Sequence, residues 1–211
     1  MEETVLARFF QESVVGTIDM AMLDVIRENL QCGFLDWFMP LVSSLGNFGI
    51  FWILVAAFLC STKKYRKTGI MVAFSLILGL LIGNLTLKPL VGRLRPFEVD
   101  PGLTLLIPAP GDASFPSGHT LASFEAATVL MIREKKTMGI PALILASLIG
   151  CSRLYLQVHF PTDVLFGALL GVVNGWIAVK CIDVLWERRN RKIGTDDSLG
   201  KDVRSGTRDE E

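Results

Sequence analysis

Charged residues are scarce in this sequence, and histidine and cysteine are scarcer still. Only 20% of the 211 residues are charged, against about a quarter in an ordinary soluble domain. The 21 basic and 21 acidic residues cancel, which excludes a basic nucleic-acid-binding protein. The four cysteines stand far apart without a C-x-x-C pair, so they indicate neither a disulfide framework nor a thiolate metal site. Hydrophobic residues make up 51% instead, and the mean hydropathy of +0.47 indicates a small integral membrane protein with one domain.

Five uncharged or nearly uncharged segments are long enough, with their flanks, to cross a hydrocarbon layer of about 30 Å. They are residues 37–60, 68–87, 116–132, 137–152 and 164–179. One charge, Glu125, interrupts the third segment. The predicted fold class is therefore all-α, a polytopic membrane helix bundle with about five transmembrane helices and six as the alternative.

Residues 14–30 show a different pattern, with apolar side chains at helical spacing and charged side chains on the other faces. We expect an amphipathic helix along the membrane interface, because its charges would be costly at mid-bilayer. The predicted organisation is an N-terminal segment over residues 1–34, a membrane-embedded domain over residues 35–187 and a disordered tail over residues 188–211. The tail prediction follows from its polar, mixed-charge composition.

Basic residues give the direction of the spans. They cluster between the first two spans, between the third and fourth, and after the fifth, at residues 63–67, 133–136 and 180–192. With five spans, all three clusters fall on one side, which is then cytoplasmic and holds the C-terminus. The loops 88–115 and 153–163 fall on the opposite, extracytoplasmic side.

This outer side should be poor in lysine and arginine, yet it carries several at the ends of spans. Both histidines of the chain fall on the same side, as does an aspartate four residues after the second. The set is Lys88, Arg95, His119, Arg153, His159 and Asp163. Three stretches far apart in the sequence can thus meet in one outer pocket, where clustered cations favour a phosphate group.

The stretch Pro116-Ser117-Gly118-His119 adds a helix start to this pocket. Proline suits a first turn, the hydroxyl of Ser117 can cap the helix, and Gly118 lets a phosphate approach the backbone. The free N–H groups and the positive end of the helix dipole both favour an anion.

These residues resemble the three-part signature of the type 2 phosphatidic acid phosphatase superfamily. Its parts here are Lys88-x6-Arg95-Pro96, Pro116-Ser117-Gly118-His119 and Ser152-Arg153-x5-His159-x3-Asp163. Eleven specified residues, in order and on one membrane face, make the signature specific. The resemblance covers about residues 35–187, which would then form a phosphatase domain.

The resemblance implies a metal-independent phosphatase without a cofactor. His159 would be the nucleophile that forms a phosphohistidine, Asp163 would hold its ring, and His119 would be the general acid and then the base. The expected phosphate-binding residues are Lys88, Arg95, Ser117, Gly118 and Arg153.

The expected partners are a lipid phosphate or diphosphate and the surrounding membrane lipids. Residues 105–108 and 112–117 resemble bacterial undecaprenyl-diphosphate phosphatases linked to bacitracin resistance. Phosphatidylglycerophosphate or phosphatidic acid is the alternative substrate. Two other classes stay open: vanadium haloperoxidases, which have a similar constellation but are soluble, and a non-enzymatic lipid transporter, which would not need paired histidines.

Several neighbouring charges have no part in the signature. Glu125 either has a function or makes a structural hydrogen bond inside the bundle. Glu98, Asp100 and Asp112 are predicted to be solvated loop charges, and Arg93 is predicted to be a charge at the rim of the pocket, although it could meet a second phosphate.

Overall fold

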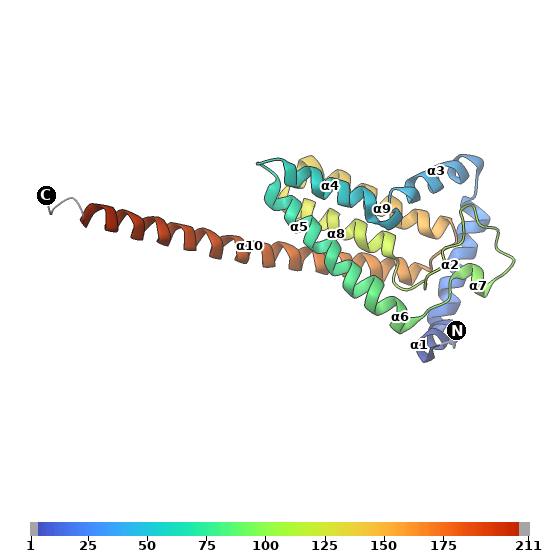
Figure 1. Cartoon of the computed structure of the whole chain (residues 1–211). Coiled ribbons are helices and arrows are strands. Elements are labelled where there is room, and N and C mark those ends of the chain that lie inside the picture. Colours follow the sequence, from blue (N-terminus) through green and yellow to red (C-terminus); the bar gives the residue numbers. More distant parts are fainter. Residues whose placement is uncertain (1–3, 207–211) are drawn as a thin grey trace.

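The computed structural model describes residues 4–206, without the side chains of residues 7, 11 and 192–206. Within this range all regular structure is helical (Figure 1). The elements are α1 (Val5–Glu12), α2 (Val14–Leu30), α3 (Gly33–Ser44), η1 (Asn47–Gly49), α4 (Ile50–Ser61), α5 (Arg66–Gly79), η2 (Leu80–Leu87), α6 (Lys88–Val91), α7 (Pro96–Val99), α8 (Gly118–Arg133), η3 (Lys135–Gly139), α9 (Ile140–Tyr155) and α10 (Pro161–Gly206). The prediction of an all-α membrane bundle is confirmed.

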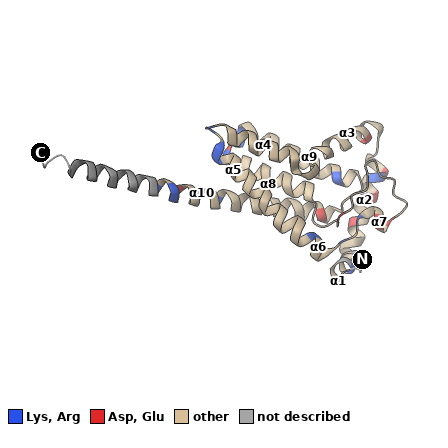
Figure 2. Ribbon diagram, viewed as in Figure 1, with Lys and Arg blue, Asp and Glu red and all other residues tan. Residues whose placement is uncertain are grey.

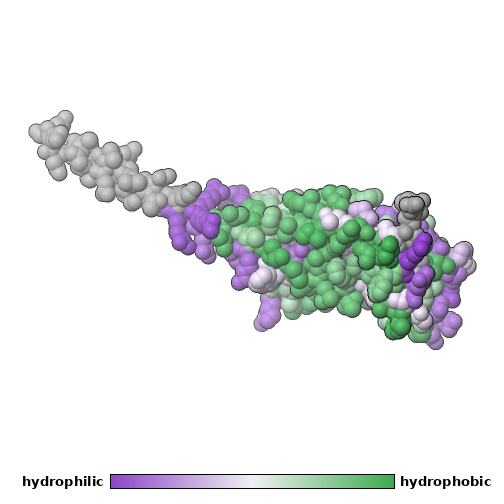
Figure 3. Space-filling view, turned by 90° about the horizontal axis from the view of Figure 1, so that it is seen from below, coloured by the Kyte–Doolittle hydropathy of each residue, from purple (hydrophilic) through white to green (hydrophobic). Residues whose placement is uncertain are grey.

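Three helices are long and apolar enough to cross a membrane within the described range: Arg66–Val99, Lys135–Tyr155 and Pro161–Arg191. A fourth candidate is α3 with the segment Asn47–Ser61, bent by 41°. Figure 3 shows a hydrophobic band on the visible face of the bundle, between two hydrophilic ends. Helix α8, the third predicted span, has 16 residues and lies inside the bundle, so the count of five stays a prediction.

The first predicted span is broken where it was expected to be continuous. Helix α3 ends at Ser44, and the chain turns through Phe48 and Gly49, whose φ angles of 52° and 66° are left-handed. A helix cannot continue through two such residues. The break places Gly46 and Asn47 against His119, a residue of the candidate site.

Helix α8 is the centre of the bundle, and α10 packs closely along it. Gly167, Gly171 and Gly175 of α10 recur at four-residue spacing on this contact. A Cβ atom at each would lie 2.7–2.8 Å from an atom of α8 or of Ser117. Small residues at this spacing let two helix backbones approach. The contact therefore fixes the beginning of α8 against the beginning of α10.

Helix α2 occupies the residues predicted for the amphipathic helix and lies across one end of the bundle (Figure 1). Apolar side chains such as Ile18 and Val25 are more than half exposed. One of its charges departs from the prediction, because Asp19 faces the bundle and is only 1% exposed. Buried charges need partners, and Asp19 pairs with Arg93.

The end of α10 falls on the residues that the sequence analysis assigned to a tail. Helix α10 continues without a break to Gly206, where disorder was expected from residue 188, and residues 207–211 lie outside the described part. Glu187 and Arg191 form an i,i+4 ion pair at 3.7 Å, the kind of contact that supports an exposed helix. Figure 2 shows basic residues at the α4–α5 turn and on α10 at this end of the molecule.

Candidate active site

A cavity of about 1130 Å³ is lined at one end by residues of α6, α8 and α9 and extends between α4 and α5. Six of the eight predicted site residues line it: Lys88, Arg95, Gly118, His119, Arg153 and His159. The other two, Ser117 and Asp163, are fully buried beside it. The structure thus brings together residues from α6, the loop before α7, α8, α9 and the α9–α10 turn.

His159 lies in the turn before α10 and is 1% exposed. Its Nε2 atom is 3.3 Å from Nη1 of Arg95. A guanidinium can only donate hydrogen bonds, so this contact requires the lone pair on Nε2 and places the ring proton on Nδ1. Burial, and then the charges of Arg95 and Arg153, keep the pKa of His159 well below its usual range. The ring is therefore neutral and presents a lone pair to the cationic end of the cavity.

Asp163 supports His159 less directly than predicted. Its Oδ2 atom is 3.6 Å from Nδ1 of His159, longer than a hydrogen bond. Ser114 stands beside both groups: its hydroxyl donates to Oδ2 of Asp163 at 2.5 Å and lies 3.4 Å from Nδ1 of His159. The backbone N–H of Phe160 donates to the same carboxylate oxygen at 2.9 Å. Ser114 was missed, because it precedes the signature motif.

Arg93 is not at the rim of the pocket, and that prediction was wrong. Its side chain is 1% exposed and lies between the rings of Phe10 and Phe160, with centroids 4.7 and 4.0 Å away. It donates to Oδ1 of Asp163 and to Oδ2 of Asp19, both at 2.6 Å. Two acidic partners and two aromatic faces compensate the burial of this charge.

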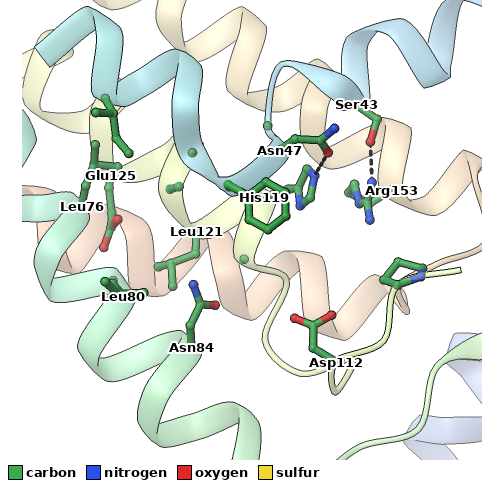
Figure 4. A pocket seen from close by; sticks show the side chains of 18 of the residues that line it. Ser43, Asn47, Leu76, Leu80, Asn84, Asp112, His119, Leu121, Glu125 and Arg153 are labelled. Carbon is green, nitrogen blue, oxygen red and sulfur yellow. Dashed lines mark hydrogen bonds between the residues drawn. The ribbon is translucent and has the colours of Figure 1, made fainter. Parts of the chain in front are cut away.

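His119 occupies the first turn of α8 and faces the broken segment between α3 and α4. Its Nε2 atom is 2.9 Å from Oδ1 of Asn47 (Figure 4). Since that oxygen can only accept, Nε2 carries a proton in this contact. A Cβ atom at Gly46 would lie 2.6 Å from the ring of His119, so glycine makes the approach possible. Asn47 was missed in the sequence analysis, although Gly46 and Gly49 on either side of it indicated that the helix could break within this uncharged segment.

The three cations of the cavity are each engaged by groups of the chain itself. Arg95 donates from Nη2 to Oδ1 of Asp112 at 2.6 Å and from Nε to its carbonyl at 2.8 Å. Lys88 pairs with the same carboxylate, and Arg153 donates to the hydroxyl of Ser43 (Figure 4).

Asp112 was predicted to be a solvated loop charge, and its side chain is indeed 56% exposed, but it is ion-paired. Partial burial favours a higher pKa, and Lys88 and Arg95 outweigh it, lowering the pKa of Asp112 to about 2. Its carboxylate therefore stays charged and occupies the position between two cations that an anionic ligand would need.

Ser117 does not cap α8 with its hydroxyl as predicted. It is the residue before the helix, and its Oγ shares a hydrogen bond with Oγ1 of Thr120 at 2.9 Å. Gly118 begins the helix and lines the cavity. The first N–H groups of any helix have no intrahelical acceptor, so this helix start directs donors and a positive dipole end towards the cavity.

Glu125 lines the deeper part of the cavity and is 1% exposed. Its Oε1 atom accepts a hydrogen bond from Asn174 at 2.7 Å, the structural contact that the sequence left open. Gly79 makes room for it, since a Cβ atom there would lie 2.3 Å from Oε1. Among the side chains that the structure describes, no group of three or more His, Cys, Asp or Glu residues is arranged to hold a metal ion.

Comparison with known proteins agrees with this constellation. Residues 68–187 match the model of the PAP2 superfamily. The chain is 36% identical over 154 residues to a protein named undecaprenyl-diphosphatase from Sulfolobus acidocaldarius, which covers 73% of this chain and 72% of that relative. It is 30% identical over 151 residues to undecaprenyl-diphosphatase BcrC of Bacillus subtilis, covering 72% of this chain and 77% of BcrC.

A solved structure is similar as well. The crystal structure of a transmembrane PAP2-type phosphatidylglycerolphosphate phosphatase from Bacillus subtilis has a TM-score of 0.67 and 28% sequence identity, covering 85% of this chain and 90% of that chain. The family match spans more than half of the chain and includes every predicted site residue. The chain therefore belongs to the PAP2 superfamily, and it is a membrane lipid phosphatase.

Proposed function

We propose that this phosphatase hydrolyses undecaprenyl diphosphate to undecaprenyl phosphate. The observation that carries the proposal is the continuity of the cavity, in which the cationic end opens directly into an apolar groove. The relatives from Sulfolobus acidocaldarius and Bacillus subtilis, both named undecaprenyl-diphosphatases, support the same substrate class.

The groove suits a long hydrocarbon chain. Its walls come from α4 and α5 and are apolar and mostly small, at Ile53, Ala56, Ala57, Ala73 and Ile77. An amphiphile could place its phosphates among the cations while its chain stays at membrane depth. Such a lipid need not be withdrawn into water, which would cost about 0.8 kcal/mol for each CH₂ group.

In the proposed reaction, Nε2 of His159 attacks the terminal phosphorus. The new N–P bond forms as the bond between phosphorus and the bridging oxygen breaks, and the lipid monophosphate departs. The imidazolium form of His119 donates a proton to that oxygen, and the resulting neutral ring then removes a proton from water, which attacks the phosphohistidine and releases inorganic phosphate. Asp163 stabilises the charge that develops on the His159 ring, acting through the Ser114 hydroxyl beside both groups.

The negative charge of the transferring phosphoryl group requires fixed positive partners. We assign this role to Lys88, Arg95 and Arg153, together with the helix start at Ser117 and Gly118. Asp112 would have to leave its two cations when the substrate phosphate binds. We further propose that this end of the bundle faces the extracytoplasmic side of a cell membrane and that α10 ends on the cytoplasmic side, because the three basic clusters lie at the other end.

Phosphate release from three lipids by the detergent-purified protein tests the proposal. Undecaprenyl diphosphate, phosphatidylglycerophosphate and phosphatidic acid would be compared in the presence of EDTA, each against the His159→Ala variant. We expect the diphosphate to be preferred and the variant to be inactive on all three. Preference for a glycerolipid would overturn the substrate assignment and retain the mechanism. Turnover by the variant would overturn the role of His159.

A further inference from the structure

The N-terminal helix α2 reaches the catalytic centre through a chain of buried charges. Asp19 of α2, Arg93 and Asp163 of α10 form two consecutive ion pairs with N–O distances of 2.6 Å. Each of the three side chains is at most 1% exposed. Asp19 lies outside residues 68–187 that match the family model, so the signature assigns it no role.

Three side chains accept hydrogen bonds from the Arg93 guanidinium and hold it in one orientation. Its Nη1 atom donates to Asp163 and, at 2.7 Å, to the hydroxyl of Thr162, while Nη2 donates to Asp19. Thr162 donates in turn to Asp19 from its backbone N–H at 3.1 Å and from its hydroxyl. Asp19 thus accepts three hydrogen bonds, all from residues that position the first turn of α10.

The charges of this group explain why a second carboxylate is needed. Arg93 alone would cancel the negative charge of Asp163, because both lie in a buried region where charge interactions are strong. Asp19 offsets the arginine, and the three residues together carry one negative charge. That charge is then available to the His159 ring as the ring becomes positive during phosphoryl transfer.

We propose that Asp19 is a positioning residue for phosphoryl transfer, acting through Arg93 on Asp163. The inference rests on the proposed roles of His159 and Asp163. Asp19 does not line the cavity and is not expected to touch substrate. Its loss should therefore lower the rate of the chemical step and leave substrate binding nearly unchanged.

The test measures kcat and KM for phosphate release from undecaprenyl diphosphate with four full-length variants. Asp19→Asn should lower kcat about 10- to 100-fold, the range found when an outer partner that orients a metal-binding histidine is removed, and change KM less than about twofold. Asp24→Asn is the matched control on the same helix, because Asp24 is 45% exposed and pairs with Arg27 away from the cavity. It should keep the wild-type kcat.

The Asp19→Asn/Arg93→Gln double variant separates charge balance from a purely structural role. It removes one charge of each sign and restores the single negative charge of the group, so its kcat should exceed that of Asp19→Asn several-fold. A double variant no more active than Asp19→Asn, a loss confined to KM, or a wild-type kcat for Asp19→Asn would each overturn the inference.

Two comparisons keep the outcomes distinct. If Asp19→Asn does not fold, the double variant is compared with wild type directly; a folded but inactive double variant would overturn the inference. The fourth variant, His159→Ala, tests the underlying mechanism. If this variant released phosphate, the proposed role of His159 would be refuted, and with it the inference about Asp19 that rests on it.

Discussion

Replacing Asp112 by asparagine should make inorganic phosphate a stronger inhibitor of this phosphatase. In the structure the Asp112 carboxylate engages Lys88 and Arg95, and any phosphate must displace it. The pKa of Asp112 falls from 3.8 to about 2. At ~1.36 kcal/mol for each pKa unit, this corresponds to about 2.4 kcal/mol of favourable interaction between the charged carboxylate and its surroundings. The side chain is 56% exposed, so solvent screens much of this energy. We take about 1 kcal/mol as the cost of displacing it.

A cost of about 1 kcal/mol predicts that phosphate binds about fivefold more tightly to the Asp112→Asn variant. The assay is the inhibition constant of inorganic phosphate against release of phosphate from a labelled lipid diphosphate. Asp100→Asn is the control, because Asp100 belongs to the same loop and pairs with Arg27 at 3.7 Å, outside the cavity. An inhibition constant that is unchanged, or raised, in Asp112→Asn would refute the idea that this carboxylate occupies the phosphate position.

Three further predictions concern the histidines and the groove. His119→Asn should lose less activity on p-nitrophenyl phosphate than on a lipid diphosphate, because a good leaving group needs no proton; equal losses would argue against the acid role. The ring of His159 should stay neutral at pH 6, since its pKa is lowered by burial; NMR of histidine-labelled protein resolves this with only two histidines present, and titration of His159 near pH 6.5 would contradict it. Gly79→Ala should destabilise the protein by about 1–3 kcal/mol in denaturation measurements, because the new Cβ atom meets Glu125; unaltered stability would show that the carboxyl group can move aside.

The sequence predicted those parts of the molecule that depend on local patterns. Helix α2 was expected from apolar spacing over residues 14–30 and has those bounds. The motifs placed both histidines and the three cations of the signature on one face, and they meet in one cavity. Periodicity and motif spacing determine these features, because they require only the identity of nearby residues and the alternation of membrane sides.

Contacts between distant segments could not be read in the same way. Asn47 meets His119 across 72 positions of the chain, and Arg93 meets Asp19 across 74. No periodic pattern encodes such a pairing, since it depends on how the helices pack. The error on Arg93 has the same origin. An arginine beside an outer loop is usually solvated, and the burial of Arg93 depends on its ion pair with the distant Asp19, which offsets the cost of desolvation.

Two sets of cations near the catalytic centre, Lys88 with Arg95 and Arg93 alone, differ in what happens when substrate binds. Lys88 and Arg95 share a half-exposed carboxylate on a loop, which a phosphate can replace because water can take up the displaced charge. Arg93 is held by two carboxylates that are almost fully buried, and removing one partner of a buried pair leaves an uncompensated charge that costs about 3–5 kcal/mol. Substrate should therefore exchange with Asp112 and leave the Asp19–Arg93 pair intact. Asp112→Asn should therefore change the affinity for phosphate, whereas Asp19→Asn should change kcat. Because the two substitutions act on separate steps, their free-energy effects should add in the double variant.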